Sequence, residues 1–412
     1  MKIGTGLLPE AKPGSTMVLP VNVRRGAGPR KEEKPEDTVM HPLKMANSCG
    51  RGWLPNYGSG LPLLKDKIQF PSFVRTNPST EKMPYVLSQL VIHFGWTWVG
   101  ILGSYTDYGL HGIQELKKEF SVSGVCVSFL ETLSPDSPRA KIQRTVRSIT
   151  ESTAAVIIVY AFAPELISIM EELVAQEITG KVWIASPSLM GSPLFFRQSL
   201  WNLLNGTMGP VIHARDIPLF KDFQYRNRPS ASSGDIFVRP FWEHVFRCRW
   251  ANSLTHVNAA HNESIGGVPG CTGEEQLQTL QSSVYDGANL RFSYTAYNAV
   301  YVFAHAVHKL LSCDPKRGEC SGAQDLQPWK LLHFVKTSHF LNPVGDELYF
   351  DDHGDSPHVV SVANWQLAPD GTNRYAYVGV YDDRLPQDQK LIIHDELVGW
   401  GAGYSEVRNS DV

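Results

Sequence analysis

Short stretches that mix small, polar and aromatic residues are the candidates for ligand contact in this sequence. Three of them stand where loops are expected: Tyr57-Gly58-Ser59-Gly60, Asp107-Tyr108-Gly109 and Pro187-Ser188. In the first stretch, small residues would let backbone N–H groups approach an anion. A purely structural loop explains it about equally well, so both interpretations stay open.

The motifs of common enzyme classes are missing from the sequence. There is no GxSxG nucleophile elbow, no GxxxxGK(S/T) phosphate loop and no HExxH zinc motif. His305 and His308 lie three residues apart on an expected helix, where a core or capping pair is the better explanation than a metal site. The Asp pairs at 351–352 and 382–383 fall in expected turns, which favours turn chemistry over acid–base catalysis. We therefore predict no enzyme activity and no metal or cofactor site.

Composition indicates a folded chain that does not bind nucleic acid. The 412 residues are 42% hydrophobic and 19% charged, with a formal net charge of -3 at pH 7. Such a chain can form two or three domains, or one bilobal protein. The balanced charge, without a basic stripe, argues against nucleic-acid binding. No apolar run approaches the roughly 20 residues of a membrane helix, and the first residues lack the apolar core of a signal peptide.

Cysteines and glycosylation sequons favour a secreted compartment. The six cysteines show neither a CxxC pair nor zinc-site spacing: Cys49, Cys126, Cys248, Cys271, Cys313 and Cys320. Those at 271, 313 and 320 lie in Gly/Pro/Ser-rich loops, which favours disulfides. Asn205 and Asn262 each begin an N-x-S/T sequon, a weak signal taken singly. The missing signal peptide contradicts this compartment.

Hydrophobic periodicity predicts the elements that must position the candidate loops. Residues 1–53 carry many Pro and Gly residues and no sustained period, so we expect them to be disordered. Beyond them, helices and strands alternate, with helices at 83–94, 113–124, 138–152 and 164–177 and strands at 96–103, 125–133, 154–161 and 181–186. This alternation predicts a doubly wound parallel sheet. Ligands of such sheets bind outside the carboxyl ends of the strands, where Asp107–Gly109 and Pro187–Ser188 stand.

The second half of the chain departs from this rhythm. We predict helices at 239–250, 293–313 and 326–338, a long irregular stretch at 251–284, and antiparallel strands within 346–383. On the longest helix, the residues expected to face inward are Tyr297, Val300, Tyr301, Ala304 and Val307.

Several segments, taken in order, resemble the extracellular ligand-binding domain of class C G-protein-coupled receptors. They are YGSGLPLLKDKIQFPSFVRTNP at 57–78, HFGWTWVG at 93–100 with the DYG cluster after it, EITGKVWIAS at 177–186, FWEHVFRC at 241–248, CTGEE at Cys271 and the helix at 293–313. The resemblance covers about residues 54–405. It is strongest to vomeronasal type 2 receptors and their fish olfactory relatives, which also look like the calcium-sensing receptor.

The resemblance implies a bilobal Venus flytrap, an α/β fold of the periplasmic-binding-protein-like type I. Lobe 1 would comprise 54–78 and 216–378 and be incomplete, and lobe 2 would comprise 79–215 and 379–405. Such a domain closes on an amino acid, a peptide or a cation at the extracellular face of the plasma membrane. The resemblance also implies a dimer that signals to a G protein through a cysteine-rich linker and seven membrane helices.

The resemblance places the candidate loops at the ligand. The Tyr57–Gly60 loop would hold the ligand carboxylate, although Gly60 stands where relatives usually have Ser or Thr, so one hydroxyl is missing. Asp107 and Tyr108 would line the cleft of lobe 2, with the Tyr108 ring against the ligand amine in a cation–π contact.

Two positions depart from the amino-acid-sensing members. Pro187 stands where those members carry an acid that pairs with the ligand ammonium, and a cation without that partner loses a charge-assisted bond. Phe162 stands where they often have a small hydroxyl residue. Both changes speak against a free α-amino acid in the usual pose and fit a peptide, another ligand class or a degenerate receptor.

The resemblance also implies how the cysteines pair. Cys271 and Cys313 would form a disulfide within lobe 1, and Cys248 would bond to the cysteine-rich domain and so be left unpaired in this chain. Cys126 is expected to be a buried free thiol, and no role is assigned to the remaining two cysteines.

The chain also departs from the family at its ends. Family members have a signal peptide and further lobe 1 strands before the YGSG segment, and continue into membrane helices. We therefore expect a fragment or an incomplete gene model, unstable in lobe 1 and nearly complete in lobe 2. The alternatives left open are a soluble small-molecule binding protein of the same architecture and a non-functional receptor fragment, with an α/β enzyme least supported.

Overall fold

The structure of the 412-residue chain is a computed structural model. It describes residues 55–192, 197–226, 228–229, 237–250, 268–280, 290–312, 327–369, 371 and 373–401. Several expectations lie outside these ranges, namely those for residues 1–53, Cys49, Asn262, Cys313 and Cys320.

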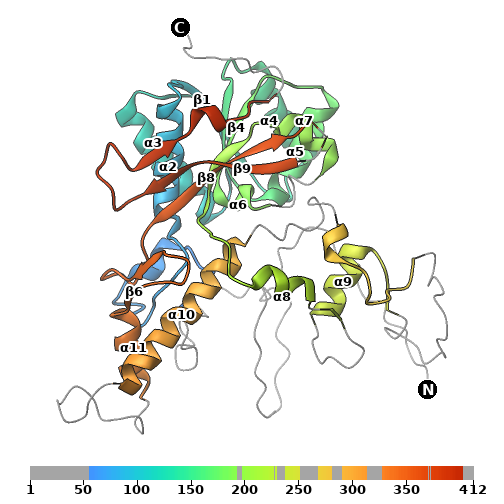
Figure 1. The fold of residues 1–412 in the computed structure, drawn as a ribbon. Helices are drawn as coiled ribbons and strands as arrows, with labels where there is room; N and C mark the ends of the chain where they lie inside the picture. Colours follow the sequence, from blue (N-terminus) through green and yellow to red (C-terminus); the bar gives the residue numbers. More distant parts are fainter. Residues whose placement is uncertain are drawn as a thin grey trace, which may run out of the picture.

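An eight-stranded sheet forms the larger part of the described fold (Figure 1). The strands are β1 (Trp98–Ser104), β2 (Cys126–Leu133), β3 (Val156–Tyr160), β4 (Val182–Ala185), β5 (Met208–Ile212), β8 (Val359–Leu367), β9 (Asn373–Asp382) and β10 (Leu391–Ile393), in the order β10-β9-β8-β5-β4-β3-β1-β2. Strands β1 to β5 pair in parallel, whereas β8, β9 and β10 extend the sheet in antiparallel fashion. Strand β3 is buried at every residue, as its unbroken Val/Ile run predicts. The predicted α/β fold class is confirmed.

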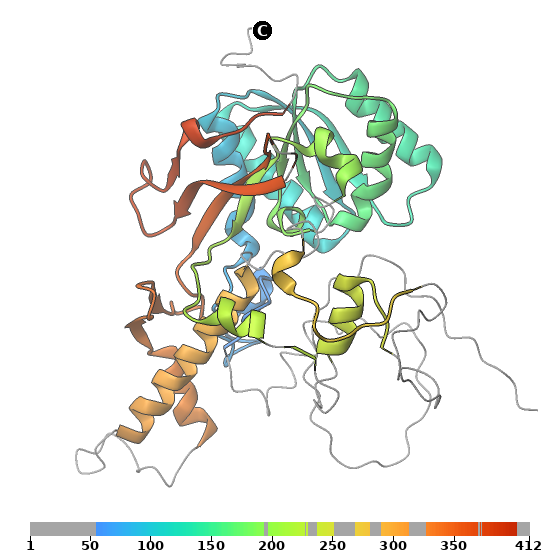
Figure 2. The ribbon, with the colours of Figure 1, turned by 45° about the vertical axis from the view of Figure 1, so that its right-hand side comes forward.

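Helices cover both faces of this sheet, as Figures 1 and 2 show. They are α2 (Met83–His93), α3 (Asp107–Ser123), α4 (Arg139–Glu151), α5 (Ala163–Ala175) and the short α6 (Pro187–Met190) and α7 (Trp201–Leu204). Helices α2 and α3 pack together over one apolar cluster, which includes Leu87 and Phe120. Helices α4 and α5 pack together over the other, which includes Ile149 and Leu173. Helix α3 ends at Gly124, whose φ of 76° is that of a left-handed C-cap.

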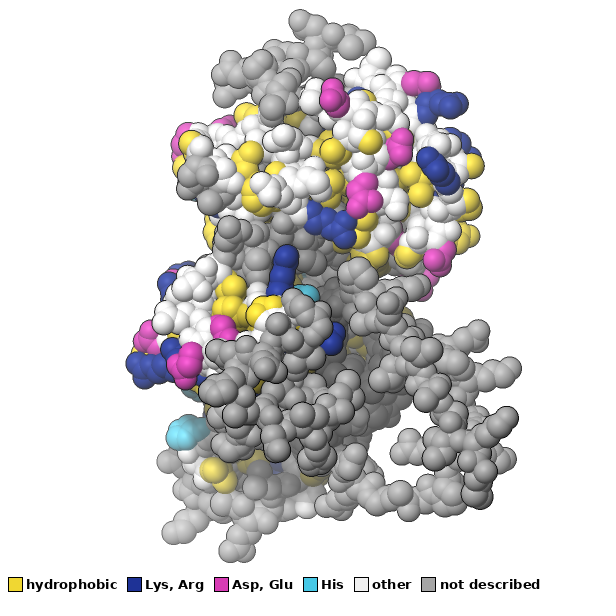
Figure 3. Space-filling view, turned by 90° about the vertical axis from the view of Figure 1, so that its right-hand side faces the viewer, with side chains coloured by type: hydrophobic (Ala, Val, Ile, Leu, Met, Phe, Trp, Pro, Cys, Tyr) yellow, Lys and Arg dark blue, Asp and Glu magenta, His cyan; other side chains and the backbone are white. Residues whose placement is uncertain are grey.

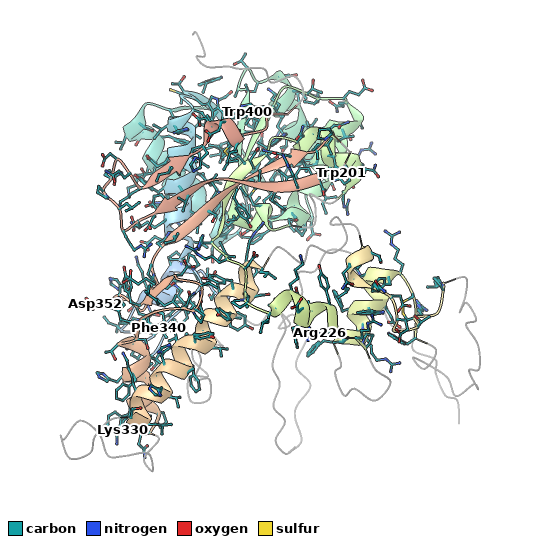
Figure 4. The ribbon with its side chains drawn as sticks, viewed as in Figure 1. Trp201, Arg226, Lys330, Phe340, Asp352 and Trp400 are labelled. Atoms are coloured by element: carbon teal, nitrogen blue, oxygen red, sulfur yellow. A yellow bond between two sulfur atoms is a disulfide. The ribbon has the colours of Figure 1, made fainter. Side chains whose placement is uncertain are left out.

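A smaller part of the chain lies below the sheet in Figure 1, with α10, α11 and β6 at the left and α8 and α9 extending to the right. Its elements are α8 (Phe220–Arg226), α9 (Val238–Phe246), α10 (Arg291–Ser312), α11 (Pro328–Lys336) and the hairpin of β6 (His339–Leu341) and β7 (Glu347–Tyr349). Helices α10 and α11 pack side by side. Phe340 of the hairpin, labelled in Figure 4, stacks on His305 of α10 with ring centroids 3.8 Å apart. His305 is therefore a packing residue.

The inward face predicted for α10 is wrong. Most of the predicted residues are partly buried, and Val300 is 56% exposed. The fully buried positions include Asn298, Val302, Ala306 and Leu310 instead. Helix α10 carries apolar residues on more than one side. The side that is buried is the one that contacts α11 and the hairpin, and the periodicity of the sequence does not show these contacts.

The predicted lobe boundary at residue 378 is also wrong. Strand β8 pairs with β5, from Met208 opposite Asn364 to Ile212 opposite Val360, and β9 pairs with β8. Residues 359–378, assigned to lobe 1, thus belong to the same sheet as 79–215. The sequence analysis did not predict strand β5. Because β8 pairs with β5, and β9 with β8, both later strands belong to this sheet.

The predicted cysteine pairing is corrected by the structure. Cys271 bonds to Cys248, with Cα atoms 5.0 Å apart, so Cys248 is not left unpaired and Cys271 is not free for Cys313. Two backbone hydrogen bonds bring the segments together: Arg249 N–H donates to the carbonyl of Pro269 and Cys271 N–H donates to that of Arg249, each at 2.9 Å. Cys126 is a free thiol, as expected, but it is exposed rather than buried because it begins the edge strand β2.

Candidate functional site

The carboxyl ends of three neighbouring parallel strands, β4, β3 and β1, lie next to one another at one edge of the sheet. Open parallel sheets bind their ligands in a crevice outside such strand ends, so this edge is named the crevice. Each strand leads directly into predicted site residues: β1 into Asp107 and Tyr108, β3 into Phe162, and β4 into Pro187. The structure therefore brings these side chains to one edge, as the alternating pattern predicts. This crevice is the candidate ligand site of the sheet domain.

The Asp107-Tyr108-Gly109 cluster is the first turn of helix α3, where the sequence analysis expected a loop. The Thr106 side chain caps this turn by accepting from Gly109 N–H at 3.4 Å. A Cβ atom on Gly109 would lie 2.2 Å from the backbone oxygen of Ser104, so glycine is required for the helix to start this close to β1. Asp107 is exposed, whereas Tyr108 is partly buried and reaches the rings at the end of β3.

Three aromatic rings line the crevice. The Tyr108 ring centroid lies 4.6 Å from that of Tyr160 and 4.9 Å from that of Phe162. Tyr160 is buried, whereas Phe162 is 40% exposed and presents apolar surface to the crevice. Burial raises the pKa of both tyrosines, so both hydroxyls are neutral donors at physiological pH.

Two buried hydroxyls in this crevice, that of Tyr108 and that of Ser186, the residue before α6, make no hydrogen bond of good geometry. Ser186 lies close enough to the Tyr108 hydroxyl to lower its pKa, so the two hydroxyls are neighbours. A buried donor left without a partner costs about 1–3 kcal/mol, so a bound polar group would be stabilised here. Pro187, the first residue of α6, offers no side-chain polar group of its own. The crevice therefore offers hydroxyl donors beside an exposed aromatic ring.

The buried carboxylate next to the crevice, that of Glu165, is hydrogen-bonded to other groups of the protein. Glu165 is 6% exposed and accepts from Ser104 Oγ at 2.5 Å and from Phe162 N–H at 2.9 Å. It caps the start of α5, and this role was missed in the sequence. The spacing of a capping box was present, but Phe162 stands where Ser or Thr normally signals the motif.

The Tyr57–Gly60 loop is held by its own neighbours. The Asn56 side-chain oxygen accepts from the N–H groups of Gly58 and Ser59, at 3.0 and 2.6 Å, and these are groups that were expected to hold a ligand carboxylate. The carbonyl of Tyr57, whose side chain is 44% exposed, accepts from Thr295 of α10 at 2.8 Å. A Cβ on Gly60 would lie 2.7 Å from Thr80 Cγ2, so a Ser or Thr here would need a shift of Thr80.

A second hollow, a cavity of about 250 Å³, lies where the chain passes between the sheet and the α10 region. Three segments that are far apart in the sequence contribute to its lining, for example through Thr76, His213 and Pro357. Asp346 accepts from Tyr294 and, at 2.7 Å, from Arg215 Nε. Burial opposes ionisation of Asp346, but hydrogen bonds from His213 and Tyr294 outweigh it and bring its pKa to about 2. The charge of Asp346 in this region, called the hinge because the chain crosses here between the sheet and α10, is thus paired within the protein.

The sequon at Asn205 lies in a packed part of the sheet domain. The Asn205 side-chain oxygen accepts from Leu367 N–H at 3.0 Å, and Thr207 is buried and donates to the carbonyl of Leu204 at 2.6 Å. A glycan here would have to be added before the chain folds, and glycosylation of Asn205 stays a prediction.

Surface charge, helix hydrophobicity and the grouping of possible metal ligands were compared with what nucleic-acid binding, membrane spanning and metal binding require. Figure 3 shows acidic and basic side chains interspersed over the face that it displays. None of the helices in the described ranges is long and apolar enough to cross a membrane. Within the same ranges, no group of three or more His, Cys, Asp or Glu side chains could hold a metal ion.

Comparison with known proteins gives consistent matches. The family model described as "Receptor family ligand binding region" matches residues 54–368. The chain is 32% identical to the extracellular calcium-sensing receptors of Sus scrofa and Homo sapiens over 88% of its length. It is 28% identical to taste receptor type 1 member 2 of Macaca mulatta over 74% of its length. The chain spans 36% of the calcium-sensing receptors and 34% of the taste receptor.

Proposed function

Since the chain belongs to the family of receptor ligand-binding regions, we propose that it is the extracellular ligand-binding region of a class C G-protein-coupled chemosensory receptor. The chain spans about a third of its curated relatives, so the activity of a whole receptor is part of this proposal. A location at the outer face of the plasma membrane, dimerisation and coupling to a G protein through a membrane domain are proposed on the same basis.

The crevice at the ends of β1, β3 and β4 is the observation that carries the proposal. It combines the exposed ring of Phe162 with the unpartnered hydroxyls of Tyr108 and Ser186. Tyr57, Gly58, Ser59 and Gly60 are proposed to line the facing side, which requires Asn56 to release the loop N–H groups when ligand binds.

The crevice chemistry favours a ligand other than a free α-amino acid held in the usual pose. Its buried carboxylate, Glu165, is engaged in capping α5, and Pro187 offers no anion to an ammonium group. An aromatic surface beside hydroxyl donors suits a peptide or another ligand with an apolar part and a hydrogen-bond acceptor.

Ligand-dependent thermal stabilisation of the secreted full chain tests this function. Calcium ions, amino acids and short peptides would be screened, since a ligand that binds the folded state raises the melting temperature. Two variants locate the site: Phe162→Ala removes the exposed ring, and Tyr108→Phe removes a hydroxyl but keeps its ring. The control is Tyr377→Phe, which removes a hydroxyl from a half-exposed residue of β9.

The expected result is an apparent affinity about five- to tenfold weaker in Tyr108→Phe, unchanged in Tyr377→Phe. A ligand that binds both crevice variants as tightly as the wild type would refute the crevice as its site.

The alternatives, a soluble small-molecule binding protein and a non-functional receptor fragment, are distinguished by sequencing the full transcript. A reading frame that continues into a cysteine-rich domain and apolar spans would exclude the first.

A further inference from the structure

At the crevice, two helices that start side by side pack on opposite faces of the sheet. Helix α3, which follows β1, contributes Ile113 to one apolar cluster, and helix α5, which follows β3, contributes Ile169 to the other. Strands β1 and β3 are neighbours, with Gly103 opposite Tyr160. Because the helices pack in different clusters, neither cluster holds one helix start against the other.

A hydrogen-bond network connects these two helix starts. Ser104, the last residue of β1, donates from its hydroxyl to Glu165 of α5 at 2.5 Å. The Thr106 hydroxyl lies 2.8 Å from Ser104 Oγ and accepts from Gly109 N–H in the first turn of α3 at 3.4 Å. The other carboxylate oxygen of Glu165 accepts from Phe162 N–H at 2.9 Å. One buried carboxylate is thus linked to the start of each helix.

The direction of the network follows from the number of hydroxyl hydrogens. Ser104 gives its one hydroxyl hydrogen to Glu165, so in the bond between Ser104 and Thr106 the donor is Thr106. Each hydroxyl therefore accepts from one neighbour and donates to the next, and hydrogen bonds arranged in this way strengthen one another. An ionised carboxylate only accepts, so Glu165 is the group in which the bonds from both helix starts end.

The two rings that contact each other in the crevice belong to the segments that the network connects. Tyr108 lies in the first turn of α3, and Phe162 directly precedes α5 and donates its own N–H to Glu165. Their ring centroids are 4.9 Å apart. A movement of one helix start relative to the other would separate these rings.

From this geometry we propose that Glu165 is a positioning residue of the crevice, whose carboxylate holds the starts of α3 and α5 together and so fixes Tyr108 against Phe162. The inference rests on the proposed function, because the two rings are taken to contact the ligand. A site whose side chains are already ordered binds more tightly, since the binding free energy is not used to order them.

Three variants test this role in the full chain. Ser104→Ala removes one buried hydroxyl and leaves the bond from Phe162 N–H to Glu165 in place. Glu165→Ala removes both bonds of the carboxylate, and Ser104→Ala carries the test if Glu165→Ala does not fold. The matched control is Ser88→Ala, because Ser88 is equally buried but its hydroxyl donates to the carbonyl of Tyr85 within α2.

Two measurements are made on each variant. The first is amide hydrogen exchange, followed by mass spectrometry, in peptides covering 105–112 at the start of α3 and 160–168 at the start of α5. The second is the apparent affinity, from thermal stabilisation, of a ligand that depends on Phe162 in the screen described above.

We expect Ser104→Ala to speed exchange in 105–112 about fivefold and to leave 160–168 unchanged, because only the bond on the α3 side is lost. The same variant should weaken the ligand about fivefold, and Ser88→Ala should change neither quantity. Glu165→Ala should speed exchange in both peptides. Adding Ser104→Ala to Glu165→Ala should then have no further effect on affinity, because both substitutions interrupt one network.

Equal exchange of 105–112 in Ser104→Ala and Ser88→Ala would overturn the proposal, and so would losses of affinity that add up in the double variant. If Glu165→Ala speeds exchange in 160–168 alone, Glu165 only caps α5. A ligand that depends on Phe162 but binds Ser104→Ala like the wild type would refute the positioning role and leave the proposed function intact. Because exchange needs no ligand, the expected exchange pattern with no ligand found would support the network and count against the proposed function alone.

Discussion

Replacing Asp355 with asparagine should strongly destabilise the fold, because Asp355 is the counter-ion of a fully buried arginine. The side chain of Arg75 is 0% exposed, and its Nε and Nη2 donate to the two Asp355 carboxylate oxygens at 2.7 and 2.8 Å. Its Nη1 donates to the carbonyl of Leu61 at 2.8 Å. Asp355→Asn keeps the shape of the partner but leaves the guanidinium charge buried and uncompensated. Breaking such a pair costs about 3–5 kcal/mol.

Calorimetric unfolding measures this cost. At about 2–4 °C per kcal/mol for domains of 150–250 residues, the melting temperature should fall by about 6–20 °C. The control is Arg197→Gln, which breaks an exposed pair with Glu171 and should cost less than about 1 kcal/mol. Replacing both members, as Arg75→Met with Asp355→Leu, should recover part of the loss. If Asp355→Asn shifts the melting temperature no more than Arg197→Gln does, the Arg75–Asp355 pair does not stabilise the fold as its geometry indicates.

Three further predictions follow from the same structure. Gly109→Ala should destabilise by about 1–3 kcal/mol in chemical unfolding, because its Cβ has no room, whereas Gly58→Ala, with nothing within 4 Å, should not. Asp346, with its pKa lowered from 3.8 to about 2, stabilises the fold above about pH 4, and this contribution fades as the pH falls toward 2; the gap in melting temperature between wild type and Asp346→Asn should narrow over that window and stay constant above it. Replacing Cys248 and Cys271 by serine should cost about 3 kcal/mol, the value for a loop of this length, and a reductant should then have no added effect on unfolding.

The parallel part of the sheet could be predicted from the sequence because local signals agree there. Strand β3 reads as an uninterrupted Val/Ile run, and Gly124 ends α3 where a left-handed residue is needed. The positions of Asp107, Tyr108 and Pro187 at the ends of β1 and β4 followed from topology, since parallel strands bring their carboxyl ends to one edge. Phe162, at the end of β3, followed from the family resemblance.

What could not be predicted depends on contacts between segments far apart in the chain. Strand β5 is short, and its pairing with β8 joins residues about 150 positions apart, so periodicity gave no reason to place β8 and β9 in this sheet. The bond between Cys248 and Cys271 rests on the backbone pairing around Arg249, which spacing does not reveal.

The hinge and the crevice differ in the side chains that they leave available to a ligand. At the hinge, Arg75 is paired with Asp355, and Asp346 is bonded to Tyr294 and Arg215, so each charge has a partner without any ligand. At the crevice, by contrast, the buried hydroxyls of Tyr108 and Ser186 make no hydrogen bond of good geometry. Charged groups that stabilise the connection between the sheet and α10 need hydrogen-bond partners in the ligand-free protein, because a buried group without a partner destabilises the folded state. Buried hydroxyls that lack a partner lower the stability of the empty form and raise its affinity for a group that bonds to them, which supports the proposal that a ligand binds at the crevice.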